Sequence, residues 1–261
     1  MTEVQLLRFQ PGRSRLLVSI PHAGTHLPPG LAARMTTAGR ALPDTDWHVP
    51  RLYDFLAEEG ASVLVATHSR YVVDLNRPAD DGPLYPGQAG TGLCPLQTFD
   101  GADIWLPGAA PDAAELARRV EQYWQPYHQQ LRGAIEALRE RHGSVLLWDA
   151  HSIRSRVPRL FAGELPVLNF GSNGGRSCDP GLAAQLMACA GRAPHHPAVL
   201  DRRFRGGHIT RAYGDPARGV QAIQLELAQR CYMDEASGGY REDLAAGIRP
   251  LLRELIRIAA G

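Results

Sequence analysis

Two histidines in this sequence follow apolar runs that have the character of buried strands. Residues 145–148 are four large apolar residues, and His151 comes three positions later. Residues 16–20 form a second such run, which ends just before His22. Runs of this kind are typical of strands buried on both faces, and in open α/β sheets ligands bind at the carboxyl ends of such strands. The pattern therefore predicts that His22 and His151 meet in one metal or catalytic site.

Acidic residues complete a candidate metal centre. Two histidines and one carboxylate are the protein ligands of a catalytic zinc, with one position left for water. Asp46, in the segment after the first predicted strand, is the proposed third ligand, and Asp44 remains an alternative. Glu226 ends a later predicted strand and is the candidate general base, which would take a proton from that water. The sequence thus predicts metal-assisted hydrolysis at His22, Asp46 and His151.

Several cationic and amide side chains indicate an anionic substrate. Arg70, Asn76 and Arg77 lie close together in the chain, and Arg211 follows a Gly-Gly pair that ends in Gly207. Guanidinium groups are rigid donors suited to carboxylates, and paired glycines let the backbone approach a ligand. One arginine could also stabilise the oxyanion of an amide hydrolysis. Taken with the metal ligands, these residues predict amide hydrolysis of a small molecule that carries carboxylates.

Each of these residues also has a structural interpretation. Either histidine alone is as readily a core histidine, and Asp44 or Asp46 alone could be the N-cap of the helix predicted after residue 48. The Asp149–His151 stretch is also similar to the metal motif of arginase-like ureohydrolases. That family is excluded because Ile153 stands where its second Asp is required.

The elements that must position these residues alternate between strand and helix. Strands are predicted at 61–66, 71–76, 166–170 and 220–226, and helices at 111–142, 179–190 and 240–259. Alternation in the 71–76 run would place Arg70, Asp74 and Asn76 on one strand face. Pro126 should kink or split the first helix, and His128 and His142 are expected at the surface. Residues 78–110 are rich in Gly and Pro and are expected to form a binding loop or lid. Such alternation predicts an α/β fold.

Composition narrows the class of protein. The chain has 261 residues, a formal net charge of +1 and 44% hydrophobic residues, so we expect one domain over 1–261 that binds neither nucleic acid nor membrane. All 28 basic residues are Arg, which excludes mechanisms that need a lysine amine. Residues 1–10 show no export signal, so a cytoplasmic location with four free cysteines is expected.

The motifs together resemble the N-formylglutamate amidohydrolase (N-formylglutamate deformylase) family. The matching stretches are 19–25, 44–47, 69–78, 90–95, 149–152, 169–172, 206–211 and 224–226. The resemblance implies hydrolysis of N-formyl-L-glutamate to formate and L-glutamate, the last step of one histidine degradation route. The family is similar in turn to zinc carboxypeptidases, which implies a three-layer α/β sandwich with a mixed, mostly parallel sheet (phosphorylase/hydrolase-like).

The same resemblance assigns roles to the candidate residues. It implies one divalent metal, expected to be zinc, on His22 and His151, with Glu226 as general base. Thr25 stands where carboxypeptidases have their glutamate ligand, so Asp46 must replace that ligand. Asn76 and Arg77 would clamp a substrate carboxylate, Arg211 would neutralise the second carboxylate, and Arg70 would face the formyl oxygen.

Two other functions remain open at this point. The first is an amidohydrolase for another N-acyl acidic amino acid, such as an N-formimidoyl or N-acetyl compound. The second is a non-catalytic dicarboxylate-binding protein, which would need the arginines but neither Glu226 nor the two histidines. The metal could also be cobalt, iron or manganese. The role of His208, motion of the 78–110 loop and the oligomeric state are left open by the sequence.

Overall fold

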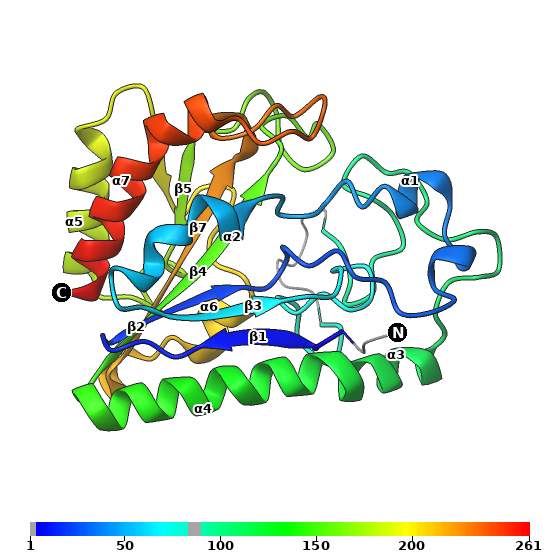
Figure 1. Ribbon diagram of the computed structural model, residues 1–261, viewed down its shortest axis with the longest axis horizontal. Coiled ribbons are helices and arrows are strands. Elements are labelled where there is room, and N and C mark those ends of the chain that lie inside the picture. The colour runs from blue at the N-terminus through cyan, green and yellow to red at the C-terminus, as the bar shows by residue number, and fades with distance from the viewer. Residues whose placement is uncertain (1–3, 83–89) are drawn as a thin grey trace.

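A computed structural model describes residues 4–82 and 90–261 of the chain. Seven strands form one sheet in the order β1-β3-β2-β4-β7-β5-β6 (Figure 1). The strands are β1 (Leu7–Gln10), β2 (Leu16–Ile20), β3 (Ser62–Ala66), β4 (Val145–Ile153), β5 (Leu168–Gly171), β6 (Ala198–Leu200) and β7 (Val220–Ala228). The sequence predicted β2, β3, β4, β5 and β7, but it predicted neither β1 nor β6. The strand predicted at 71–76 does not form.

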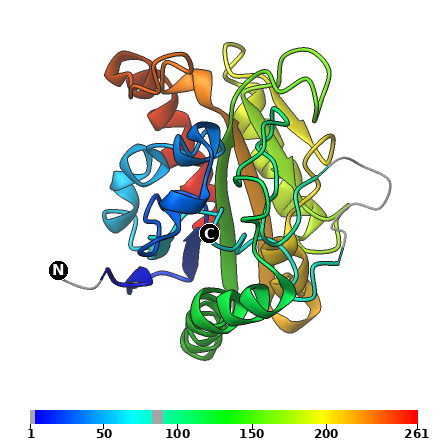
Figure 2. The ribbon, with the colours of Figure 1, turned by 90° about the vertical axis from the view of Figure 1, so that its right-hand side faces the viewer.

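The sheet is mixed and mostly parallel, as predicted. β2 pairs in parallel with β3 and β4, β4 pairs in parallel with β7, and β5 pairs in parallel with β6. Only the pairs β1–β3 and β5–β7 are antiparallel. β4 and β7 stand at the centre of the molecule (Figure 2). Their register places His151 directly beside Glu226, so both side chains leave the sheet on the same face.

Helices cover both faces of the sheet. They are α1 (Thr37–Arg40), α2 (Val49–Leu52), α3 (Ala113–Arg119), α4 (Gln125–His142), α5 (Pro180–Gly191), α6 (His208–Tyr213) and α7 (Glu242–Ala260), with short 3-10 turns at 32–34, 54–57, 216–218 and 229–231. α4 and α6 pack on the face that buries Leu17 and Leu147. α2, α5 and α7 pack on the face that buries Trp148 and Leu225. The predicted three-layer α/β architecture is therefore confirmed.

The long helix predicted at 111–142 is split in the way that Pro126 suggests. α3 begins at its N-cap Asp112, whose side chain accepts a hydrogen bond from the Glu115 amide. A π-helical turn at Val120–Trp124 follows, and the amide of Gln125 donates to the carbonyl of Val120. α4 then runs from Gln125 to His142. Proline has no N–H to donate within the helix, so a break in the regular pattern beside it is expected.

Two expectations about local structure were wrong. Residues 71–76 form turns instead of a strand, because the Asp74 side chain accepts a hydrogen bond from the Asn76 amide at 2.9 Å and closes a local turn. His128 is fully buried instead of exposed, since the core supplies hydrogen-bond partners for both of its ring nitrogens. His142 is exposed, as expected. Neither Asp44 nor Asp46 caps α2, whose N-cap is His48.

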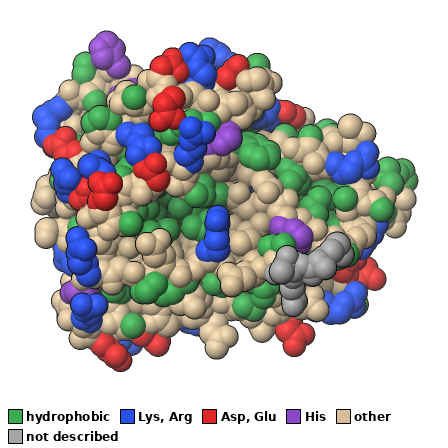
Figure 3. Space-filling view, viewed as in Figure 1, with side chains coloured by type: hydrophobic (Ala, Val, Ile, Leu, Met, Phe, Trp, Pro, Cys, Tyr) green, Lys and Arg blue, Asp and Glu red, His purple; other side chains and the backbone are tan. Residues whose placement is uncertain are grey.

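The surface carries interspersed charges of both signs. On the face drawn in Figure 3, basic and acidic side chains alternate over the side where α5 and α7 lie. Ion pairs there include Arg192 with Glu254 and Arg253 with Glu58. This mixture agrees with the net charge of +1. No helix within residues 4–82 and 90–261 has the length and apolar character needed to cross a membrane.

Candidate active site and metal centre

Two parallel strands and one loop bring the three predicted metal ligands together. His22 follows β2, and His151 lies in the neighbouring strand β4. The Asp46 amide donates to the carbonyl of His22 at 3.1 Å, which holds Asp46 beside that strand end. One ligand atom from each of the three side chains lies within 4.8 Å of the others, and all three residues are buried. The structure therefore brings His22, Asp46 and His151 into one group that could hold a metal ion.

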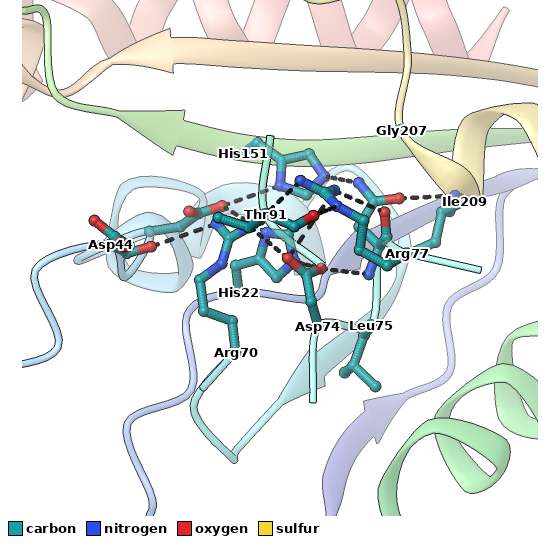
Figure 4. A network of polar contacts seen from close by, with 12 residues as sticks. His22, Asp44, Arg70, Asp74, Leu75, Arg77, Thr91, His151, Gly207 and Ile209 are labelled. Atoms are coloured by element: carbon teal, nitrogen blue, oxygen red, sulfur yellow. Dashed lines mark hydrogen bonds and ion pairs between the residues drawn. The ribbon is translucent and has the colours of Figure 1, made fainter. Parts of the chain in front are cut away.

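The orientation of the two imidazole rings suits metal binding. Nε2 of His22 lies 2.7 Å from Oδ1 of Asp74 (Figure 4). Nε2 of His151 lies 3.0 Å from Oδ2 of Asp149. Nδ1 of each ring faces Oδ2 of Asp46, at 3.8 Å for His22 and 3.0 Å for His151. A carboxylate at Nε2 can hold the ring proton there and leave Nδ1 as a ligand. At His151, Nδ2 of Asn76 also lies 2.9 Å from Nε2. Both rings are thus held with Nδ1 directed at the same point.

Buried negative charge also fits a cation at this point. Asp44, Asp46, Asp74, Asp149 and Glu226 are all buried around the group. Two arginines in the pocket, at positions 70 and 77, balance part of this charge. Buried carboxylates require pairing or a bound cation, because their desolvation is costly. The donor set therefore fits a divalent metal ion.

The two histidines differ in their protonation. Burial and the nearby Arg70 lower the pKa of His22. Burial also opposes charge on His151, but the carboxylates of Asp149 and Asp46 outweigh it and raise the pKa of His151 well above its usual value. A metal ligand must be deprotonated at the coordinating nitrogen. Metal binding at this group would therefore release a proton from His151.

Glu226 lies beside the group on β7. Its carboxylate is buried, and its Oε2 accepts a hydrogen bond from Nε2 of Gln224 at 3.0 Å. Burial raises the pKa of Glu226 to about 8, with Asp46 and Asp149 adding to the rise and His151 and Arg70 opposing it. A carboxyl group whose pKa lies near neutrality can both accept and donate a proton. Glu226 thus lies in the pocket beside the three candidate ligands, where a carboxyl group could exchange a proton.

A pocket with a volume of about 620 Å³, part of it open to solvent, leads to the group. Most predicted site residues line it: His22, Arg70, Asn76, Arg77, His151, Gly207 and Glu226. Asp46 lies behind them, in contact with both histidines. Arg211 is not among the lining residues, and its Nε donates to the carbonyl of Gly206 at 2.8 Å. The structure therefore places most of the predicted site in one pocket, and Arg211 is not part of its lining.

Arg70 and Arg77 are held differently in the pocket. Arg70 is buried, and its NH2 lies 2.5 Å from Oδ2 of Asp74. Nε of Arg70 has no hydrogen-bond partner within the described part of the chain. Arg77 is half-buried, and its Nε and NH2 donate to the carbonyl and hydroxyl oxygens of Thr91. Arg70 is thus fixed toward the metal group, while Arg77 lies further along the pocket beside the loop that contains Thr91.

The sequence of this chain matches one known protein family over most of its length. A family model described as N-formylglutamate amidohydrolase matches residues 14–233. The chain belongs to the N-formylglutamate amidohydrolase family. It is 53% identical over 97% of its length to a protein of Pseudomonas aeruginosa, and 50% identical over 97% of its length to one of Pseudomonas putida. Both are named N-formylglutamate deformylase, and the matches cover 95% of each.

Two solved structures have the same fold as this chain. The crystal structure of N-formylglutamate amidohydrolase from Ralstonia eutropha superposes with a TM-score of 0.83 at 26% identity, over 98% of this chain and 97% of that chain. A gene product of Agrobacterium tumefaciens superposes with a TM-score of 0.72 over 97% of this chain and 95% of that chain. Its identity of 18% shows the fold alone.

In this amidohydrolase, the geometry favours Asp46 over Asp44 in the metal group. Oδ2 of Asp44 accepts hydrogen bonds from the Tyr71 hydroxyl at 2.5 Å and from the Phe99 amide at 2.9 Å. Burial raises the pKa of Asp44, although these partners act against the rise. Asp44 therefore braces the pocket wall at Tyr71 and Phe99, whereas Asp46 faces both histidines.

Gly207 permits a close approach that no larger residue would allow. A Cβ atom at this position would lie 2.3 Å from Nδ2 of Asn76. The Gly207 amide donates to Oε1 of Gln224 at 2.6 Å, and the Ile209 amide donates to Oδ1 of Asn76 at 2.7 Å. Nδ2 of Asn76 in turn donates to Asp149 at 3.1 Å. The glycine therefore lets the start of α6 approach Asn76 closely enough to hydrogen-bond its side-chain amide.

Sequence reasoning missed several residues of this amidohydrolase site. Asp149 lies two positions before His151 in β4, so strand alternation could have placed both on one face. Gln224 stands in the same relation to Glu226 on β7. Arg203 lines the pocket from the loop after β6, and no spacing in the sequence points to it. Apolar lining residues also lacked a signal: Phe99, Ile153, Leu160 and Phe204.

Proposed function

We propose that this chain hydrolyses N-formyl-L-glutamate to formate and L-glutamate. The observation that carries the proposal is the buried group of His22, Asp46 and His151. This group lies beside Glu226 in a pocket that is also lined by arginines. The names of the two Pseudomonas relatives support the same reaction. The single domain predicted over 1–261 would carry the whole site.

We further propose that the reaction depends on a metal ion, expected to be zinc, held by His22, Asp46 and His151. Such an ion, when bound, supplies a Lewis acid that lowers the pKa of water toward neutrality. Asp74 and Asp149 would keep the imidazole rings in the tautomer that binds it. The donor set alone also suits cobalt, iron or manganese.

The remaining steps belong to residues of the chain. Glu226 would accept the proton of the attacking water and then deliver it to the amide nitrogen as the C–N bond breaks. The buried guanidinium of Arg70 would stabilise the negative charge that develops on the formyl oxygen. Because Asp74 holds Arg70 at 2.5 Å, this donor needs little reorganisation during the reaction.

The two substrate carboxylates require cations at the outer part of the pocket. Arg77, with Asn76 beside it, is the proposed clamp for one carboxylate. Arg211 was predicted for the other carboxylate, and that role stays a proposal. Arg203 lines the pocket as well, with its Nε donating to the carbonyl of Leu160 at 2.7 Å, and it competes with Arg211 for this role.

Replacing Arg77 by Ala should raise KM for N-formyl-L-glutamate about 10- to 100-fold and change kcat little. The reason is that a charged hydrogen bond to a non-reacting carboxylate contributes about 1.5–3 kcal/mol to binding in both ground state and transition state. Steady-state kinetics of formate release measures both constants. An unchanged KM would remove Arg77 from the clamp.

The second carboxylate can be assigned by comparing Arg203→Ala with Arg211→Ala. The variant that loses the true partner should show a KM raised about tenfold or more, and the other should stay near the wild type. Kinetics with the full-length variants decides between the two arginines. An unchanged KM in both variants would mean that neither arginine holds this carboxylate.

The substrate proposal is tested by the product released from a small panel of amides. We expect formate from N-formyl-L-glutamate, and much slower turnover of N-formimidoyl-L-glutamate and N-acetyl-L-glutamate. Faster turnover of either competitor would favour the alternative amidohydrolase. Binding of L-glutamate without turnover of any amide would favour a dicarboxylate-binding protein.

We also propose that the enzyme acts in the cytoplasm at the end of a histidine degradation route. The place in the degradation route rests on the family resemblance. Growth on histidine as the nitrogen source, with and without the gene, would test it: the deletion should accumulate N-formylglutamate, and unchanged metabolite levels would contradict it.

A further inference from the structure

A short segment without helix or strand holds several residues of the site. Asp74 contacts His22, Asn76 contacts Asp149, and Arg77 lines the pocket, yet residues 74–77 form only turns. A strand would fix its carbonyl groups through neighbouring strands. Here the buried carbonyls need other donors.

Two side chains of one helical stretch supply those donors. Nε2 of His128 lies 2.8 Å from the carbonyl oxygen of Leu75, and Nε1 of Trp124 donates to the carbonyl oxygen of Arg77 at 2.9 Å. The two donor rings stack on each other, with centroids 3.7 Å apart and planes inclined by 22°. The carbonyls on either side of Asn76 are therefore fixed by one rigid pair of rings.

The hydrogen bonds of His128 settle its tautomer. A carbonyl oxygen can only accept, so Nε2 of His128 carries the proton toward Leu75. Burial lowers the pKa of His128 to about 3, which keeps the ring neutral. Nδ1 then accepts from the hydroxyl of Tyr213, at 2.8 Å. Tyr213 ends α6, the helix whose start grips Asn76, so His128 ties the 74–77 segment to both α4 and α6.

The π-helical turn explains how these two rings come to lie together. Trp124 is the last residue of that turn, and His128 lies four residues later on α4. Residues four apart share one helix face. A π turn changes the direction of the residues on either side of it, and such turns are frequent at functional sites. Here the turn lies where the helix meets the pocket segment.

We propose that Trp124 and His128 are positioning residues that fix the backbone of 74–77, so that Asn76 and Arg77 meet a substrate carboxylate. The inference rests on the proposed function and adds to it two residues that do not touch the substrate. The half-exposed His208 lies next to this pair. The centroid of its ring is 5.8 Å from that of Trp124 and 5.5 Å from that of His128.

The test uses Trp124→Phe, which removes the N–H donor and keeps an aromatic ring. We expect KM for N-formyl-L-glutamate to rise about fivefold, the effect of one neutral hydrogen bond, with kcat within about twofold of wild type. In an Arg77→Ala background the same change should raise KM clearly less, because one of the two positioned side chains is gone. A rise of equal size in both backgrounds would overturn the inference.

Trp105→Phe is the matched control. Nε1 of Trp105 also donates to a backbone carbonyl, that of Pro95, at 2.9 Å, and Trp105 does not line the pocket. KM should be unchanged in this variant. An equal rise in Trp105→Phe would mean that the loss of any buried indole donor has this effect, and would overturn the inference.

Tyr213→Phe tests the proposed role of His128 in the same assay. Loss of the hydroxyl leaves Nδ1 of His128 without its donor, and KM should rise while kcat stays within about twofold. An unchanged KM would remove His128 from the proposal.

If the wild type released no formate, the proposed function would fail and this inference with it. Normal wild-type turnover with an unchanged KM in Trp124→Phe would overturn the inference alone.

Discussion

Replacing Glu226 by Gln should lower kcat about 100- to 10,000-fold and leave KM close to the wild-type value. The amide has nearly the shape of the carboxylate and keeps a partner for Gln224, but it cannot accept a proton from water. Because the loss concerns a proton transfer that occurs only in the transition state, binding should persist. Steady-state formate release measures both constants, and an active Glu226→Gln enzyme would exclude Glu226 as the base.

Two further measurements distinguish the loss of the base from misfolding of the variant. Burial raises the pKa of Glu226 to about 8, so the unfolded chain loses this proton at a lower pH than the folded protein does. The stability of the metal-free protein should therefore fall as the pH rises from about 4.5 to 8. The Gln variant cannot ionise, and its metal-free form should be at least as stable as wild type at pH 8. In the wild type, kcat should also rise with pH through the pKa of Glu226. A bound cation would move that pKa to a lower value.

Arg70→Lys should lower kcat about 100- to 1,000-fold, the usual effect of losing one oxyanion donor. Lysine keeps a positive charge beside the buried Asp74, so the fold should survive. It cannot reproduce the planar guanidinium, whose Nε has no partner within the described part of the chain. Formate release by this variant measures the effect.

Arg119→Lys is a suitable control for Arg70→Lys. Arg119 is also buried and also pairs with a carboxylate four residues away, Glu115 at 2.5 Å, but it does not line the pocket. Its kcat should stay near the wild-type value. A similar loss in both variants would mean that the Arg70 effect reports packing instead of oxyanion stabilisation.

Much of the metal group was predictable because strand ends are visible in a sequence. The apolar runs before His22 and His151 predict neighbouring parallel strands, and the structure places these residues with Asp46 within ligand distance of one another. Glu226 followed from the same logic, since β7 pairs in register with β4. The apolar runs mark the strands of the sheet, and the site lies where those strands end, so one pattern predicts both.

The segment around Asp74 shows where that logic ends. Its alternation of apolar and polar residues predicted a strand, but a local hydrogen bond from the Asn76 amide to the Asp74 side chain made a turn instead. The partners that stabilise this turn, His128 and Trp124, lie about fifty residues away in the chain. Contacts of that range, like the place of Arg203 in the pocket, depend on packing that periodicity does not encode.

The most direct test of a metal-dependent deformylase is formate release from N-formyl-L-glutamate before chelation, after complete chelation and after readdition of single divalent metals. Bound metal per chain should be measured at each stage, with His151→Ala as the variant that loses a ligand. We expect about one metal per wild-type chain, loss of activity on chelation, recovery with one metal, and neither metal nor activity in His151→Ala. Formate release that survives complete removal of metal would contradict the role of His22, Asp46 and His151 as the metal centre.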